Sequence, residues 1–73
     1  MSEELLAPMM GKIVQIDVNV GDSVEEDDDA ILLEAMKMET PIYIPCNGKV
    51  VKINVKVGDT VEEDAVLMVI DPQ

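Results

Sequence analysis

Residues 11–27 read GKIVQIDVNVGDSVEED, and residues 48–64 read GKVVKINVKVGDTVEED. The two stretches are 37 positions apart, and the match extends outward without a gap to residues 7–34 over 44–71, with 13 identities in 28 aligned pairs. Self-similarity at a fixed offset is typical of a repeated structural unit. We therefore expect two copies of one small unit within a single domain at residues 1–73.

Each copy has the pattern of β-strands. Apolar and polar residues alternate along it, which is typical of a strand with one buried face. The residues predicted to share that face are Val14, Ile16, Val18 and Val20, and then Val51, Ile53, Val55 and Val57. A Gly-Asp pair marks a turn in both copies, and the apolar runs 30–33 and 66–70 predict core strands. Because one copy cannot bury its apolar face alone, we expect an all-β sandwich or flattened barrel with pseudo-two-fold symmetry.

Residues 35–43 connect the two copies. Under two-fold symmetry, the image of this connection is the gap between the end of the second copy and the start of the first, where the chain termini lie. The connection is therefore expected across the axis from the termini, as an exposed hairpin. An attachment point on this hairpin could face a partner while the termini are tethered elsewhere.

The composition excludes several functional classes. The chain has no His and no Arg, so it lacks the usual general base near neutral pH and the planar fork that binds phosphate or carboxylate substrates. A net charge of −11 argues against nucleic acid as a partner, and no apolar run is long enough for direct membrane insertion. The acidic N-terminus does not resemble a signal peptide. We expect a cytoplasmic, monomeric domain that is not itself an enzyme.

Two further features have plain interpretations. The acidic runs 25–29 and 62–64 lack the alternating ligand spacing of a calcium loop, so they are interpreted as solvated turns and no metal site is predicted. The single Cys46 cannot form an internal disulfide. It is interpreted as a small packing residue without a function.

The connection between the copies opens with the sequence Glu34-Ala35-Met36-Lys37-Met38. Its lysine lies where the symmetry predicts an exposed turn, and exposed methionine pairs are unusual on a charged surface. The plain alternatives are a solvated lysine and two methionines that fill gaps in the packing. The position of Lys37 and its Met flanks favour a functional amine, with Met36 and Met38 recognised by a modifying enzyme or another partner.

This motif resembles the biotin-attachment sequence of biotinyl domains, the carboxyl carrier modules of biotin-dependent carboxylases, decarboxylases and transcarboxylases. The resemblance covers essentially the whole chain. Residues 7–11 look like the family's opening turn, and residues 21–24 and 58–61 look like its two Gly-Asp turns. The resemblance implies a flattened barrel of two four-stranded antiparallel sheets, the hammerhead or barrel-sandwich hybrid fold, with Lys37 at the tip of a tight hairpin.

The resemblance also implies a function. A biotin protein ligase would use ATP to join biotin to the Lys37 amine through an amide bond. The residues implied as its recognition motif are Glu34, Ala35, Met36 and Met38. The biotin would then shuttle a carboxyl group between the site of a biotin carboxylase or decarboxylase and that of a carboxyltransferase. Because the cofactor carries the chemistry, the lack of His and Arg is expected.

Some questions stay open at the level of sequence. Asp27 and Asp64 stand where the family usually has a turn glycine, at an expected cost of about 1 kcal/mol each. A lipoyl carrier domain of a 2-oxo acid dehydrogenase or glycine-cleavage type complex shares the fold and the lysine placement, although Met on both sides of the lysine favours biotin. An unmodified interaction module is the third alternative. The sequence names neither the acyl or oxo-acid substrate nor the parent enzyme complex.

Overall fold

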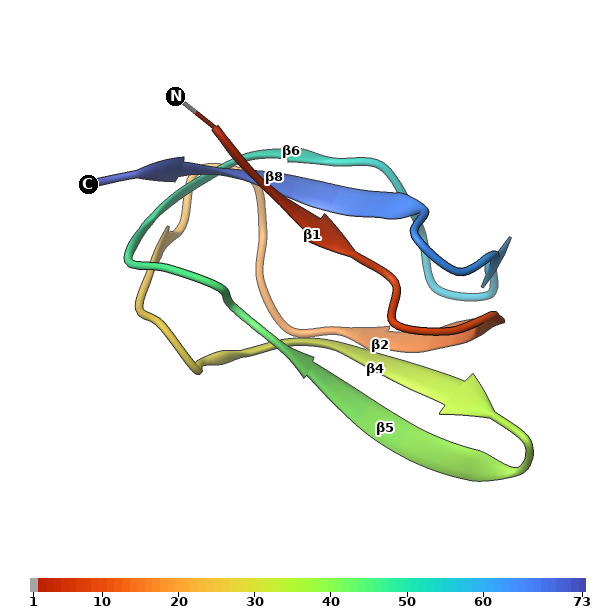
Figure 1. Ribbon diagram of the computed structural model, residues 1–73. Helices are drawn as coiled ribbons and strands as arrows, with labels where there is room; N and C mark the ends of the chain where they lie inside the picture. The colour runs from red at the N-terminus through yellow and green to blue at the C-terminus, as the bar shows by residue number, and fades with distance from the viewer. Residues whose placement is uncertain (1) are drawn as a thin grey trace.

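The computed structural model describes residues 2–73, which form β-strands joined by turns (Figure 1). The strands are β1 (Glu3–Leu6), β2 (Gly11–Ile16), β3 (Ser23–Val24), β4 (Asp29–Ala35), β5 (Met38–Tyr43), β6 (Gly48–Ile53), β7 (Thr60–Val61) and β8 (Val66–Pro72). They form two four-stranded antiparallel sheets, with strand orders β1-β8-β6-β3 and β5-β4-β2-β7. The predicted all-β fold of two four-stranded antiparallel sheets is confirmed. Within residues 2–73, no helix is long and apolar enough to cross a membrane.

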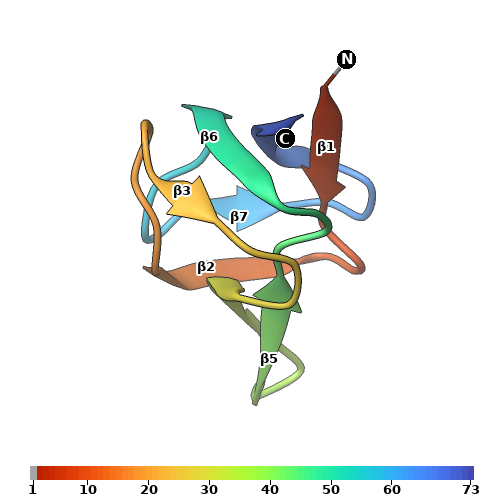
Figure 2. The ribbon, with the colours of Figure 1, turned by 90° about the vertical axis from the view of Figure 1, so that its left-hand side faces the viewer.

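The two sheets have equivalent strand orders. β2, β3 and β4 begin 37 positions before β6, β7 and β8, and β5 occupies in its sheet the place that β1 occupies in the other. The short strand of each copy pairs with the sheet of the other copy, because β3 pairs with β6 and β7 pairs with β2. Figure 2 shows β1 and β6 above, and β2 and β5 below. This exchange of short strands closes the sandwich.

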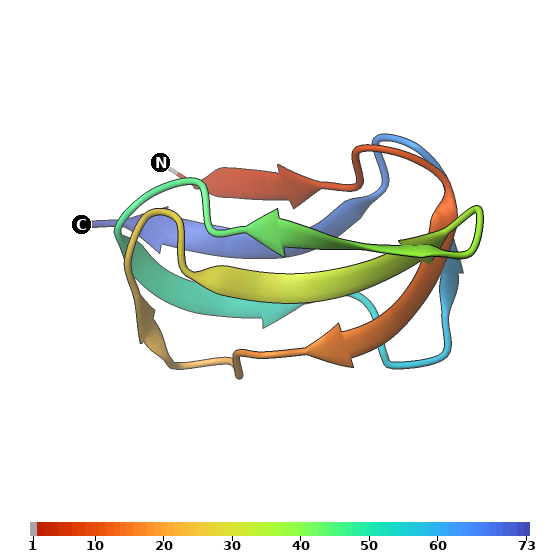
Figure 3. The same cartoon turned by 90° about the horizontal axis from the view of Figure 1, so that it is seen from below.

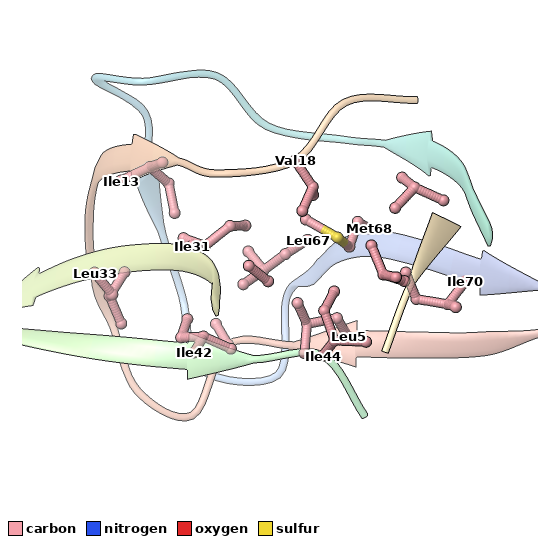
Figure 4. Packing of buried hydrophobic residues seen from close by; sticks show 14 of the residues in the cluster. Leu5, Ile13, Val18, Ile31, Leu33, Ile42, Ile44, Leu67, Met68 and Ile70 are labelled. Atoms are coloured by element: carbon pink, nitrogen blue, oxygen red, sulfur yellow. The ribbon is translucent and has the colours of Figure 1, made fainter. Parts of the chain in front are cut away.

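The space between the sheets is filled by apolar side chains (Figure 4). The largest fully buried side chains are Ile13, Ile31, Leu33, Ile44, Leu67, Met68, Ile70 and Val50. No polar or charged residue is buried within residues 2–73, so removal of aliphatic surface from water provides most of the stabilisation. The apolar runs predicted as core strands lie in β4 and β8, which are inner strands of the two sheets, and this prediction is confirmed.

The predicted alternating face is wrong in part. Val51 and Val57 are 45% and 63% exposed, whereas Val50, which the pattern leaves outside that face, is buried. The reason is a β-bulge, since the register of β6 against β8 shifts between Val50 and Lys52. An extra residue reverses which alternate side chains point inward. β6 then ends at Ile53, so the alternation that continues to residue 57 lies outside the strand, and the first copy has a bulge at the equivalent place.

Glycines at the starts of β2 and β6 bring neighbouring backbones close together. A Cβ on Gly11 would lie 2.6 Å from the carbonyl oxygen of Glu34, and one on Gly48 would lie 2.2 Å from that of Asp71. Neither position accepts a side chain unless the adjacent strand moves. Gly11 therefore allows β2 to press against the last residues of β4.

The two acidic turns, at residues 25–29 and 62–64, each contain an aspartate with a left-handed backbone. Asp27 and Asp64 have φ of 72° and 68°, in the left-handed region that glycine adopts most easily. The N–H of Asp27 donates to the carbonyl of Ile44, and the N–H of Asp64 donates to the carbonyl of Ala7, both at 2.9 Å. These bonds fix each acidic turn against the loop before β6 or β2.

The chain termini and the β4–β5 hairpin lie at opposite ends of the molecule (Figures 1 and 3). The longest extent is 35 Å, against 17 Å in the other two directions. We call these two regions the terminal end and the hairpin end. The position of the hairpin is the one that the repeat symmetry predicts.

Candidate functional site

The β4–β5 hairpin closes with the shortest common loop. The ladder between the strands ends at the pair Ala35 and Met38, which leaves only Met36 and Lys37 in the turn. These two residues have φ of 52° and 65°. Positive φ at both central positions is the property of a type I′ turn, whose twist matches that of the flanking strands.

This turn is unusual because neither central residue is Gly or Asn. A left-handed backbone costs roughly 1–2 kcal/mol for a residue with a Cβ. The ladder below the turn, including the pair Glu34 and Glu39, holds Met36 and Lys37 in this conformation. Strained backbone of this kind is concentrated at functional sites. The sequence predicted the turn but not its left-handed backbone, since it carries no glycine signal there.

The tip of the hairpin projects into solvent. Met36 is 95% exposed, Met38 is 70% exposed and Lys37 is exposed between them. Among residues 2–73, no side chain forms a hydrogen bond with the Lys37 amine. An amine in this position is accessible to the active site of another protein.

The remaining predicted motif residues form the base of the hairpin. Ala35 is half-buried where the ladder closes, and Glu34 is exposed and pairs with Glu39 on one side and Lys12 on the other. The structure thus brings all five predicted motif residues to the hairpin end. The part of the chain that the structure describes has no pocket and no group of acidic or Cys side chains placed to hold a metal ion.

Two residues that the sequence reasoning did not assign to the site also lie at the hairpin end. Met9 and Met10 are 38% and 65% exposed, in the loop directly before Gly11. Lys12 pairs with Glu34, so this loop leaves the sheet beside the last residues of β4, at the base of the hairpin. The signal that could have found them is the repeat, because Cys46 and Asn47 occupy the same positions in the second copy.

A small β-sandwich that presents an exposed lysine on a strained hairpin, far from both chain termini, has the form of a carrier domain. A family model described as "Biotin-requiring enzyme" matches residues 3–70, and the chain belongs to that family. The resemblance to biotinyl domains is confirmed.

Relatives with established names match half of the chain. The biotin carboxyl carrier protein of Streptococcus mutans is 56% identical over 36 residues, which are 49% of this chain and 28% of that protein. The gamma subunit of glutaconyl-CoA decarboxylase from Acidaminococcus fermentans is 53% identical over 36 residues, which are 49% of this chain and 25% of that subunit. The matched region is therefore only about a quarter of either relative's length.

A solved structure matches almost the whole fold. The urea carboxylase of Kluyveromyces lactis superposes with a TM-score of 0.91 at 38% sequence identity. The match covers 97% of this chain and 6% of the carboxylase. This domain is thus similar in fold to one small part of a much longer carboxylase chain, which agrees with the predicted fold.

Proposed function

We propose that this chain is a biotin carboxyl carrier domain, with biotin joined by an amide bond to the Nζ amine of Lys37. The observation that carries the proposal is the position of this amine, which stands exposed on a two-residue turn at the end of the domain opposite the termini. The names of the relatives, which refer to biotin, to carboxylation and to decarboxylation, support the same function.

The hairpin suits the attachment of an acyl group. The amine must reach an activated carboxyl group inside another enzyme, so it has to project from a convex surface. The type I′ turn provides this, because it reverses the chain within two residues and leaves the lysine exposed to solvent. Bound biotin would supply a nitrogen that accepts and gives up a carboxyl group.

The strands of this chain position the lysine side chain that would carry the cofactor. The ladder from Glu34 to Leu32 in β4 pairs with Glu39 to Pro41 in β5 and keeps the tip rigid up to the closing pair. Only the lysine side chain is then free to swing, while the domain moves as one body. The catalytic groups belong to the partners, so the domain is proposed as a non-catalytic carrier.

The proposed partners are of three kinds. A biotin protein ligase would load the lysine, a biotin carboxylase would carboxylate the cofactor, and a carboxyltransferase or decarboxylase would receive the carboxyl group. A lipoyl carrier is not favoured, because methionine stands on both sides of the lysine and one of the named relatives is a biotin carboxyl carrier protein.

Intact mass spectrometry tests the proposal. The purified domain is incubated with MgATP, biotin and a bacterial biotin protein ligase, and in a parallel reaction with lipoic acid and a lipoyl ligase. We expect the mass to increase by one biotinyl group in the first reaction and to stay unchanged in the second. A domain that accepts only lipoyl, or that stays bare in both reactions, contradicts the proposed function.

A further inference from the structure

Three exposed asparagines differ in the residue that follows each of them. Asn19 and Asn54 are followed by valine, whereas Asn47 is followed by Gly48. The backbone nitrogen of the residue after an asparagine can reach the Cγ carbon of its side chain and close a five-membered ring. A β-branched side chain on that residue crowds the ring closure, and glycine has no side chain to crowd it. Asn47 is therefore the asparagine whose amide is open to attack by its own main chain.

The hydrogen bonds of Asn47 favour this attack. Its Oδ1 accepts a 2.7 Å bond from the N–H of Glu26. This donor draws electron density from Cγ and stabilises the negative charge that forms on the oxygen when a nucleophile attacks the carbon. Within residues 2–73, no hydrogen bond holds the Nδ2 group of Asn47, whereas the Nδ2 of Asn54 donates to the Val66 carbonyl at 3.2 Å. The Asn47 amide is thus activated at its oxygen and not restrained at its nitrogen.

The attacking nitrogen belongs to Gly48, which a short strand covers. Gly48 pairs with Val24 of β3 on one side and with Pro72 of β8 on the other. β3 contains two residues and lies at the edge of its sheet (Figure 2). Short pairing at an edge opens at a lower free energy than the core of a sheet. Opening of β3 releases the backbone at Gly48, so that its nitrogen can turn toward the Asn47 side chain.

We propose that Asn47 is a site of spontaneous deamidation, which proceeds when β3 opens. The Gly48 nitrogen forms a bond to the Cγ of Asn47, and the bond from Cγ to Nδ2 breaks. The Nδ2 group leaves as ammonia, with the proton that the Gly48 nitrogen gives up. Water then adds to either carbonyl carbon of the cyclic imide and opens the ring, which leaves aspartate or isoaspartate at position 47. The net reaction consumes water, releases ammonia and changes no oxidation state.

The product is unfavourable in its surroundings. It adds a carboxylate beside the acidic turn 25–29, and like charges at short distance repel each other. Isoaspartate also lengthens the main chain directly before Gly48, where a Cβ would already lie 2.2 Å from the Asp71 carbonyl oxygen. We expect the modified domain to unfold at a lower urea concentration. The carbonyl of residue 47 accepts a 3.1 Å bond from the N–H of Gln73, so the damage lies at the terminal end and the hairpin is expected to persist.

Peptide mapping of the aged domain tests the site. The purified domain is incubated at neutral and at mildly alkaline pH, and cleavage after lysine then separates the three asparagines into different peptides for mass spectrometry. We expect conversion of Asn47 to be roughly tenfold faster than that of Asn19 or Asn54. The rate should rise with pH, because the attacking nitrogen must lose its proton. Equal rates at the three asparagines of the folded domain would contradict the proposal.

The role of β3 is tested with two variants that are equivalent in the repeat. Val24 in β3 and Val61 in β7 are 6% and 7% exposed, so Val24→Ala and Val61→Ala remove similar contacts with the core. Val24 pairs with Gly48, whereas Val61 pairs with Gly11. We expect deamidation of Asn47 to be roughly fivefold faster in Val24→Ala than in Val61→Ala, with urea unfolding to verify that both variants are folded. Equal rates would show that overall stability, and not the opening of β3, controls the reaction.

The repeat also allows the site to be moved. Met10→Asn places an asparagine before Gly11, beside the acidic turn 62–64, and Asn47→Met places at position 47 the residue that the first copy has. We expect Met10→Asn to give a second site of deamidation. We expect Asn47→Met to acquire no added negative charge on ion exchange over the same period. The proposal is overturned if residue 10 of the first variant reacts no faster than Asn19, or if the second variant gains charge at the wild-type rate.

Discussion

The hairpin end and the terminal end contain loops from two copies of one sequence unit, yet these loops present different side chains. At the terminal end, an asparagine caps the neighbouring acidic turn and a cysteine packs on the core. At the hairpin end, the equivalent residues are exposed methionines, and the adjacent turn holds Met36 and Lys37 with positive φ. The two copies therefore bury equivalent core positions but present different side chains to solvent.

Equivalent positions of the two copies are buried to the same degree in the core. Leu33 in β4 and Ile70 in β8 are equivalent in the repeat, and both are fully buried. The same holds for Ile31 and Met68. The packing of the core therefore does not account for the surface differences between the copies, such as Met9 and Met10 in place of Cys46 and Asn47.

The largest effect is expected from the two methionines that flank the lysine. Met36→Asp with Met38→Ala places a charge beside the amine and removes two apolar side chains, so recognition by the biotin ligase should weaken by about 3 kcal/mol, or roughly a hundredfold in modification rate. Initial rates with a biotin ligase and a lipoyl ligase measure the effect, and circular dichroism verifies the fold. A variant that is biotinylated at the wild-type rate would show that the methionines only fill space.

Substitution of the equivalent glycines should separate stability from modification. Gly48→Ala meets the Asp71 carbonyl at 2.2 Å, so we expect it to lower the free energy of unfolding by about 2–3 kcal/mol, with little effect on the modification rate of the folded fraction. Gly11→Ala, at 2.6 Å from the Glu34 carbonyl, should cost less stability but slow modification, because it shifts the base of the hairpin. Urea unfolding and ligase assays measure both. If Gly11→Ala and Gly48→Ala changed the modification rate equally, modification would not depend on the backbone at the hairpin end more than on that at the terminal end.

Relief of the strained turn is expected to have a smaller effect. Asn tolerates a left-handed backbone better than Met, so Met36→Asn should raise the free energy of unfolding by about 1 kcal/mol. Met38→Asn is the matched control, since Met38 is not among the residues with positive φ and should gain nothing. Thermal and urea unfolding of the two variants provide the measurement. If Met38→Asn is the more stable variant, strain at the turn is not the cause.

The smallest effect concerns the thiol at the terminal end. Burial raises the pKa of the Cys46 thiol, and the carboxylates of Glu3 and Glu26 raise it further. At neutral pH, the thiolate fraction is then lower than in an unfolded chain, so alkylation by iodoacetamide should be a few-fold slower than in urea. The difference should narrow as the pH rises above both pKa values. Glu26→Gln should speed the reaction slightly, and a folded domain that reacts faster than the unfolded chain would contradict this account.

Much of the fold could be predicted from the sequence, because the repeat and the aliphatic alternation are strong signals. The offset of 37 positions predicted the place of the hairpin opposite the termini. The alternation failed at Val51 and Val57, because a β-bulge and an early strand end are decided by pairing with β8 rather than by local pattern. The repeat also predicted that Lys37 would lie on this hairpin, whereas the role assigned to the motif Glu34-Ala35-Met36-Lys37-Met38 rests on the resemblance to biotinyl domains.

The surroundings of the motif were less predictable. Met9 and Met10 lie far from Lys37 in sequence, and the β2–β4 ladder brings their loop to the hairpin end, beside the last residues of β4. The left-handed turn at Met36 also had no signal, since residues of this type take positive φ only when the strands on both sides impose it. The pairing of strands that are distant in sequence therefore determines two features of the site, the neighbouring loop and the left-handed turn, that the local sequence does not predict.

The most direct test of the account is the biotinylation of Lys37→Arg. Arginine keeps the charge but is not an acceptor for the ligase, and the exposed position predicts a change in stability within about 0.5 kcal/mol. The variant and the wild type are incubated with biotin, MgATP and ligase, blotted with streptavidin and digested for mass mapping. We predict that the biotinyl group maps to residue 37 in the wild type and that the variant, still folded, gives no signal. A persistent signal on Lys37→Arg, with the group on Lys12, Lys49, Lys52 or Lys56, would contradict the account.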